Sequence, residues 1–237
     1  MKTSLPDTII LAGGLGTRLQ SIVKDVPKPM ALIAGKPFLY WLLKYLSAFY
    51  PSKIILSTGY LNHTVKNYFK NTFDNIKIAY SNEDEPLGTG GAIKKALNYC
   101  NTENCLILNG DTMFTIDYNS FLNFHIENKN DFTMVLKKIE NSGRYGTVKL
   151  NGHKIEAFAE KTENAKSGLI NAGIYLLGKA LINKLPNEEK FSFEKDFLEK
   201  KVNDIKLSGW VSDGYFIDIG IPEDYNKANN EFQKLFG

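Results

Sequence analysis

The stretch Leu11–Met30, LAGGLGTRLQSIVKDVPKPM, decides how the chain begins to fold. The run that leads into it, Thr8–Ala12, is apolar and β-branched, which is typical of a buried parallel strand. The glycines that follow, Gly13, Gly14 and Gly16, allow a sharp turn and a close approach of the backbone to a ligand. Successive N–H groups of such a turn can face phosphate oxygens. The stretch therefore predicts a strand followed by a phosphate-binding loop.

Two cations accompany this loop. The planar guanidinium group of Arg18 can bind two phosphate oxygens at once. Lys28 is a compact positive charge on a backbone segment that Pro27 and Pro29 make rigid. A glycine turn that serves geometry alone would not explain these cations. The loop has no Lys-Ser or Lys-Thr of a Walker A motif, and Arg18 stands where a dinucleotide fingerprint starting at Gly13 requires a glycine. The pattern favours a nucleoside triphosphate as ligand.

Composition excludes several classes of protein. The chain has 237 residues, 43% of them apolar, and we expect one domain over residues 1–237. The net charge of +3 comes from dispersed lysines and does not indicate nucleic acid binding. Cys100 and Cys105 match no zinc spacing, so we expect reduced thiols in a cytoplasmic protein. No apolar run approaches the roughly 18 residues of a membrane span, and no signal peptide is evident.

Strand-like and helix-like runs alternate through the first half. Such alternation predicts right-handed βαβ units and an α/β fold, in which a Rossmann-like mixed, mostly parallel sheet is flanked by helices. Ligands of these sheets bind beyond the carboxyl ends of the strands. The predicted elements are strands at Ile9–Ala12, Lys53–Ser57, Ile76–Tyr80 and Cys105–Leu108, and helices at Phe38–Tyr50, Leu61–Phe69, Gly90–Tyr99 and Tyr118–Glu127.

The second half has a different pattern, with short strand-like runs close together. These runs predict added β structure that is partly antiparallel. Two more helices are expected, and the second begins with Pro222 and carries acidic residues in its first turn. The predicted strands are Phe132–Lys137, Thr147–Leu150, Lys154–Ala159 and Ile170–Leu177, and the helices are Phe193–Val202 and Pro222–Leu235.

Two aspartates follow apolar runs at points where a ligand is expected. Asp111 comes just after the run Cys105–Leu108, and Asp218 ends a similar run before a glycine. Mg²⁺ is commonly held by one or two carboxylates together with substrate phosphates and water. Either aspartate alone could cap a turn or a helix. Together with the glycine loop, they favour a metal site.

A second glycine loop, Glu83–Ala92, lies between a predicted strand and a predicted helix. Gly88 and Gly90 let a flat ring approach the backbone. The acidic residues ahead of them would repel phosphates, so we expect them to contact the base. Among the common bases, guanine alone offers N1–H and N2–H₂ side by side to a carboxylate such as Glu83. The alternative is a solvated acidic turn.

The remaining candidates carry weaker signals. Glu160 and Lys161 offer an acid for sugar hydroxyls and a cation for a phosphate, although such adjacent pairs are usually surface pairs. His63, His125 and His153 have no partner at metal or triad spacing, and we interpret them as structural or surface residues.

Taken together, these motifs resemble the sugar-1-phosphate nucleotidyltransferases, also called nucleotide-diphospho-sugar pyrophosphorylases. The GGxGTRL and PKPM patterns of that family stand at Gly13–Leu19 and Pro27–Met30. The likeness continues, in order, through Pro86–Gly91, Asn109–Asp111, Tyr145–Gly146, Glu160–Lys161, Asn171–Tyr175 and Asp218–Gly220.

The resemblance implies the nucleotide-diphospho-sugar transferase fold and a role for each matching residue. Arg18, Lys28 and Asp111 would be catalytic, and Asp111 and Asp218 would bind Mg²⁺. Residues that would contact the nucleotide are Leu11, Gly13, Gly14, Gly16, Thr17, Glu83 and Gly88. Those that would contact the sugar phosphate are Gly146, Glu160, Lys161 and Asn171.

The implied reaction is attack by a sugar 1-phosphate oxygen on the α-phosphorus of a nucleoside triphosphate, with release of pyrophosphate. Such chemistry needs positioning and charge neutralisation more than a nucleophile or a histidine base. Thymidylyl enzymes of the family place Gln where Glu83 stands, whereas guanylyl enzymes for mannose-type sugars resemble ExEPLGT. The resemblance thus implies GTP and, as the sugar substrate, D-glycero-α-D-manno-heptose 1-phosphate, in synthesis of bacterial surface polysaccharide.

Other interpretations stay open at this point. A uridylyl-, cytidylyl- or mannose-1-phosphate guanylyltransferase would share the glycine loops and the aspartates. A non-catalytic nucleotide-sugar sensor would not need the metal site and both cations. A homo-oligomer is compatible with the sequence, which does not specify one.

Overall fold

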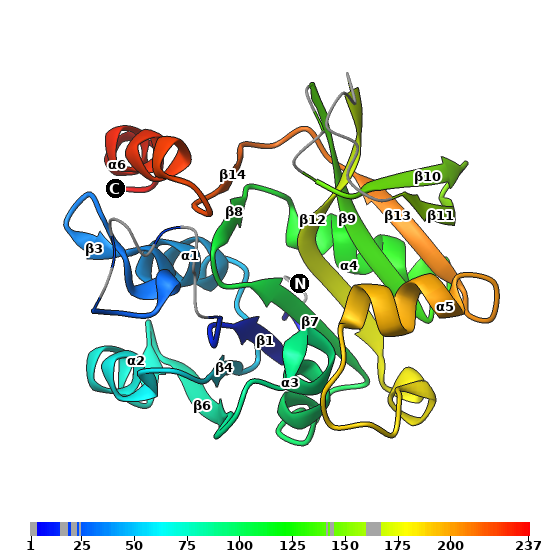
Figure 1. The fold of residues 1–237 in the computed structure, drawn as a ribbon, viewed down its shortest axis with the longest axis horizontal. Helices are drawn as coiled ribbons and strands as arrows, with labels where there is room; N and C mark the ends of the chain where they lie inside the picture. Colours follow the sequence, from blue (N-terminus) through cyan, green and yellow to red (C-terminus); the bar gives the residue numbers. More distant parts are fainter. Residues whose placement is uncertain are drawn as a thin grey trace.

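A ten-stranded mixed sheet runs through the molecule in the order β10-β11-β13-β9-β12-β7-β1-β4-β6-β5 (Figure 1). The computed structural model describes residues 4–14, 19, 23, 25–140, 142, 145–159 and 167–237. The strands of the sheet are β1 Thr8–Leu11, β4 Ile54–Thr58, β5 Thr72–Phe73, β6 Ile76–Asn82, β7 Asn104–Asn109, β9 Phe132–Glu140, β10 Thr147–Asn151, β11 Lys154–Ala159, β12 Ser167–Gly178 and β13 Leu207–Val211.

Two small ladders and a set of helices complete the fold. The ladders pair β2 with β3 and β8 with β14. Their strands are β2 Leu32–Ile33, β3 Lys36–Pro37, β8 Thr112–Phe114 and β14 Phe216–Asp218. The helices are α1 Phe38–Ser47, α2 Asn62–Phe69, α3 Gly88–Leu97, α4 Tyr118–Glu127, α5 Glu199–Lys201 and α6 Pro222–Phe236, with shorter 3₁₀ turns at η2 Lys28–Met30 and η4 Lys179–Lys184 and a π-helical turn at η5 Phe193–Leu198.

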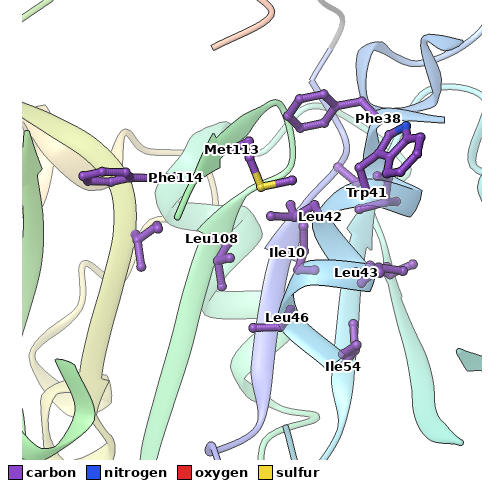
Figure 2. Close-up of a cluster of buried hydrophobic side chains, with 14 of the residues drawn as sticks. Ile10, Phe38, Trp41, Leu42, Leu43, Leu46, Ile54, Leu108, Met113 and Phe114 are labelled. Carbon is purple, nitrogen blue, oxygen red and sulfur yellow. The ribbon is translucent and has the colours of Figure 1, made fainter. Parts of the chain in front are cut away.

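The first half of the sheet has the predicted parallel arrangement. Strands β7, β1, β4 and β6 are all parallel, and each is joined to the next along the chain through a helix. Side chains alternate between two cores. Ile10 packs on the side covered by α1, α2, α4 and α6, whereas Ile9 packs on the side of α3 and η5. In Figure 2, Ile10 lies against Leu42 and Leu46 of α1.

The second half is mostly antiparallel and continues the same sheet. β12 pairs antiparallel with β7, where Ile174 lies opposite Leu108, and on its other edge with β9. β10 and β11 form a hairpin around Gly152, whose φ of 58° suits glycine. The predicted α/β class is confirmed, but the parallel pairs lie mostly in the first half, because short connections such as this hairpin permit only antiparallel neighbours, and β13 with β9 is the parallel pair of the second half.

One predicted helix differs in detail. The expected helix at Phe193–Val202 starts as the π-helical turn η5 and becomes the short α5 at Glu199. None of the helices found over the described residues combines the length and the hydropathy that a membrane-spanning segment requires.

Candidate active site

A pocket of about 530 Å³ lies at the carboxyl ends of β1, β4, β6 and β7. This is the edge at which parallel sheets bind their ligands. Its walls come from the loops that follow these strands and from the first turn of α3. The lining residues are Leu11, Gly13, Gly14, Gly59, Tyr60, Glu83, Asp84, Glu85, Pro86, Gly88, Thr89, Ala92, Asn109 and Asp111.

The first glycines of the loop after β1 have two different roles. A Cβ on Gly13 would lie 3.0 Å from Glu83 Oε1 and 3.1 Å from the Gly59 nitrogen, so the two loops meet here with little room for a side chain. A Cβ on Gly14 would find no atom within 4 Å. Gly13 therefore closes the wall of the pocket, and Gly14 keeps its surface open.

The Glu83 carboxylate is held from two sides. Its Oε1 accepts a hydrogen bond from Ser57 Oγ at 3.2 Å, and its Oε2 accepts one from the Leu87 N–H at 3.1 Å. The Glu83 N–H donates to the Thr58 carbonyl at 2.7 Å, which ties its backbone to the end of β4. A carboxylate has about four acceptor positions, so both oxygens can still accept from a ligand. The side chain is a fixed acceptor on the pocket wall.

Lys28 lies between the two predicted metal-binding aspartates. Its Nζ donates to Asp111 Oδ2 at 2.7 Å and to Asp218 Oδ1 at 3.2 Å, and the side chain is 8% exposed. Asp111 follows β7, and the β8–β14 ladder puts Asp218 opposite Thr112. The Ile219 N–H also donates to the Asp111 carbonyl at 3.1 Å. Residues far apart in the sequence thus form one charged cluster.

This cluster fits a divalent cation. Both carboxylates keep part of their surface open, with 33% of the Asp111 side chain and 21% of the Asp218 side chain exposed. Hard oxygen ligands of this kind suit Mg²⁺, which keeps places for water and substrate phosphates. In the part of the chain that the structure describes, no group of three or more His, Cys, Asp or Glu residues could hold a metal. The side chains of Asp111 and Asp218 are thus the carboxylates that this cluster offers to such an ion.

Of the predicted sugar contacts, Gly146 immediately precedes β10 and Asn171 lies on the neighbouring strand β12. Thr147 pairs with Ile170, so the residues beside this pair fall on adjoining positions. Asn171 Oδ1 accepts from the Gly173 N–H at 2.9 Å, and its Nδ2 donates to the Tyr175 hydroxyl at 2.8 Å. The Asn171 amide is therefore held in one orientation.

Some predicted site residues cannot be placed. Gly16, Thr17 and Arg18 of the first glycine loop, and Glu160 and Lys161 after β11, lie outside the residues that the structure describes.

The histidines and cysteines take no part in the pocket. His125 is buried between Thr133 and Asn104, whose side-chain oxygens lie 2.7 and 3.2 Å from its ring nitrogens. Burial lowers its pKa to about 4, against the opposing charge of Asp131. Cys100 and Cys105 are free thiols, as expected.

Sequence reasoning assigned no individual role to Tyr60, Thr89 or Glu194. Tyr60 lines the pocket with 55% of its surface exposed, and Thr89 lies in the first turn of α3. Glu194 accepts hydrogen bonds from the hydroxyls of Thr89 at 2.8 Å and Tyr175 at 3.3 Å. The position of Tyr60 just beyond a predicted strand end was a usable signal. Glu194 carried none, because its partners come from distant segments.

Comparison with known proteins defines the class. Residues 7–234 match the family model described as nucleotidyl transferase, so the chain belongs to this family and is a nucleotidyltransferase. Enzymes of this type generally use a divalent metal.

Two relatives are similar over nearly their whole length. A D-glycero-alpha-D-manno-heptose 1-phosphate guanylyltransferase of Aneurinibacillus thermoaerophilus is 48% identical over 96% of this chain and 98% of the relative. One of the same description from Campylobacter jejuni is 46% identical over 92% and 96%. The crystal structure of HddC from Yersinia pseudotuberculosis, complexed with GMP-PN, matches with a TM-score of 0.85 at 40% identity, over 96% of this chain and 100% of that one.

Proposed function

We propose that this protein transfers GMP from GTP to D-glycero-α-D-manno-heptose 1-phosphate, forming the GDP-sugar and pyrophosphate. The observation that carries the proposal is the Glu83 carboxylate, fixed on the pocket wall with acceptor capacity to spare. The descriptions of the two relatives and the GMP-PN complex of the Yersinia protein support the same substrates.

Base recognition would depend on Glu83. Its two oxygens match the paired N1–H and N2–H₂ donors of guanine, whereas uracil and thymine lack that pair. Gly88 in the first turn of α3 lines the same pocket, but a Cβ there would lie 2.6 Å from the Phe191 carbonyl oxygen, so its missing side chain and its φ of 71° serve the packing of this loop against Phe191 and not the space for a ring. Leu11 lines the same pocket and would contact the nucleotide.

The phosphates would extend from this pocket towards Lys28. Gly14 leaves room beside the backbone, and Arg18, Gly16 and Thr17 are assigned to the same loop by the family pattern. Lys28 would neutralise phosphate charge as a compact cation. Asp111 and Asp218 would hold Mg²⁺, which supplies further charge neutralisation at the phosphates when bound.

The sugar phosphate would bind on the side of β10 and β12. Gly146 and Asn171 would contact the sugar there, with Glu160, and Lys161 would bind its phosphate. The phosphate oxygen of the sugar then attacks the α-phosphorus of GTP, and the bond from that phosphorus to the pyrophosphate oxygen breaks. The residues named bind and orient the reactants, which is the main requirement of phosphoryl transfer.

Residues 1–237 would act as one nucleotidyltransferase domain, which the continuous sheet and the family match over residues 7–234 support. The product would serve synthesis of a surface polysaccharide, and the enzyme would work in the cytoplasm.

Pyrophosphate release tests the proposal directly. Purified protein with Mg²⁺ is given GTP, UTP, CTP or dTTP in turn, against heptose, mannose and glucose 1-phosphates. We expect the highest kcat/KM with GTP and the manno-heptose 1-phosphate. Preference for another pair would keep the reaction and overturn the substrates, and nucleotide binding without turnover on any pair would favour a sensor.

A further inference from the structure

Glu194 stands at the junction of the nucleotide pocket and the sugar side. It belongs to the π-helical turn η5, a form of helix that is rare and frequent at functional sites. Its Oε2 accepts from Thr89 Oγ1 at 2.8 Å and from Ser192 Oγ at 3.3 Å, and its Oε1 accepts from the Tyr175 hydroxyl at 3.3 Å. Thr89 lines the pocket, so one carboxylate connects this wall to β12.

In the hydrogen bonds that link Glu194, Tyr175 and Asn171, each group can act only as donor or only as acceptor towards its neighbour. The Tyr175 hydroxyl is completely buried, and burial together with the charge of Glu194 raises its pKa well above 10, so it keeps its proton. A carboxylate only accepts, so the hydroxyl must donate to Glu194 and accept from Asn171 Nδ2. The Gly173 N–H in turn requires the Asn171 carbonyl oxygen on its own side.

We propose that Glu194 is a positioning residue for the sugar phosphate, which acts through the Tyr175 hydroxyl to hold the Asn171 amide in one orientation. The inference rests on the proposed function, in which Asn171 contacts the sugar. With Glu194 in place, one N–H and one lone pair of the Asn171 amide are held by the Tyr175 hydroxyl and the Gly173 N–H, so the second N–H and the second lone pair keep fixed directions in which the sugar would meet them. Without it, the Tyr175 hydroxyl can rotate and no longer accepts from Asn171 Nδ2 in a fixed direction, so the Gly173 N–H alone holds the amide and sugar binding weakens.

Two substitutions interrupt the connection with little change of shape. Tyr175→Phe removes the hydroxyl and leaves the ring packed against Phe132 and Phe193. Glu194→Gln keeps the size, but an amide both donates and accepts, so it no longer dictates the direction of the hydrogen bonds. The matched controls are Tyr118→Phe, a buried tyrosine whose hydroxyl has no partner among the described residues, and Glu199→Gln, an exposed residue on α5.

The kinetic test is a double-mutant cycle between Tyr175→Phe and Asn171→Ala. We expect Tyr175→Phe and Glu194→Gln to raise the KM for the sugar phosphate about tenfold, with kcat and the KM for GTP changed less than about twofold. In the Asn171→Ala background, Tyr175→Phe should add less than about twofold, because the residue it acts through is gone. Full additivity, or an equal rise in the KM for GTP, would overturn the proposal.

A spectroscopic test separates this inference from the proposed function. The side-chain amide signals of Asn171, assigned by their loss in Asn171→Ala, are recorded by ¹⁵N–¹H NMR on the whole protein without substrate. They should shift in Tyr175→Phe and Glu194→Gln and stay in place in both controls. Signals that do not move in Glu194→Gln would overturn the inference even if turnover is as proposed. Shifts in a protein that turns over no sugar phosphate would keep the positioning of Asn171 and reject the proposed substrates.

Discussion

The parallel half of the sheet, β7-β1-β4-β6, and the largely antiparallel half, β12-β9-β13-β11-β10, build their parts of the site differently (Figure 1). In the parallel half, loops at the strand ends form the pocket, and bare glycines bring backbones together at Gly13 and Gly59. In the other half, side chains hold one another in place, as Asn171, Tyr175 and Glu194 do. One half builds the site from backbone shape, and the other from side-chain hydrogen bonds.

A charged cluster joins the parallel half to the separate β8–β14 ladder. Asp111 comes from the end of β7 and Asp218 from β14, and Lys28 holds both. Neither half contains the whole cluster, so we expect the reaction rate to depend most on this cluster. We expect stability to depend on the packing between the halves, and selectivity for each substrate to depend on the half that binds it.

The largest effect is expected from Asp111→Ala. It removes one of two carboxylates that would hold the metal, and we expect a loss of about 1,000-fold in pyrophosphate release, close to 4 kcal/mol in transition-state stabilisation. The fold should persist, because this side chain is partly exposed. Circular dichroism checks folding, and Asp213→Ala, whose target is 92% exposed, is the control for a lost aspartate. A folded variant with near-normal rates would contradict the metal site.

The next effect concerns pH and the contact between the halves. His125 on α4 bonds to Asn104 of β7 and Thr133 of β9, and its pKa is lowered by burial to about 4. The unfolded chain binds this proton near pH 6.5, whereas the folded protein does so only near pH 4, so stability falls as pH drops between these values. The loss is about 3 kcal/mol from this group.

Urea unfolding at pH 7.0, 5.5 and 4.5 measures this effect. His125→Asn should reduce the slope of the free energy of unfolding with pH over this range, and the same change at the exposed His63 should not. Equal slopes in the two variants would remove His125 as the cause.

A smaller effect on stability is expected from alanine at a glycine that packs against other residues, and almost none from alanine at a glycine that faces the ligand. A Cβ on Gly91 would lie 2.1 Å from the Glu189 carbonyl oxygen, so Gly91→Ala should cost about 2 kcal/mol of stability, or several degrees in Tm. Gly14→Ala meets no atom within 4 Å and should leave Tm nearly unchanged while weakening GTP binding. Thermal melts with and without GTP distinguish the two. A reversed pattern would mean that the glycine loop serves the fold and not the ligand.

The smallest effect is expected at the base. Glu83→Gln replaces one acceptor oxygen by a donor, so the preference for GTP over the other nucleotides should fall about tenfold in kcat/KM, about 1.4 kcal/mol. Glu127→Gln, at an exposed position of α4, is the charge control. If the preference for GTP is unchanged in Glu83→Gln, the backbone around Gly88 and not the Glu83 carboxylate recognises the base.

The sequence by itself determined the strand, loop and helix units of the parallel half. The strand Thr8–Leu11, the helix Tyr118–Glu127 and the loop with Glu83 lie where the patterns predicted them, within a few residues. These features are readable because apolar runs, glycines and prolines act on their immediate neighbours. The resemblance to a family supplied the roles of residues that local patterns could not assign.

Only the tertiary structure decided which distant residues meet. Asp111 and Asp218 come together through the register of the β8–β14 ladder, and Lys28 of η2 bonds both. Glu194 reaches Tyr175 and Thr89 because η5 packs beside β12 and α3. Register and packing depend on which surfaces bury one another across the whole chain. A local sequence pattern does not specify which distant surfaces pack together, so these contacts are visible only in the folded molecule.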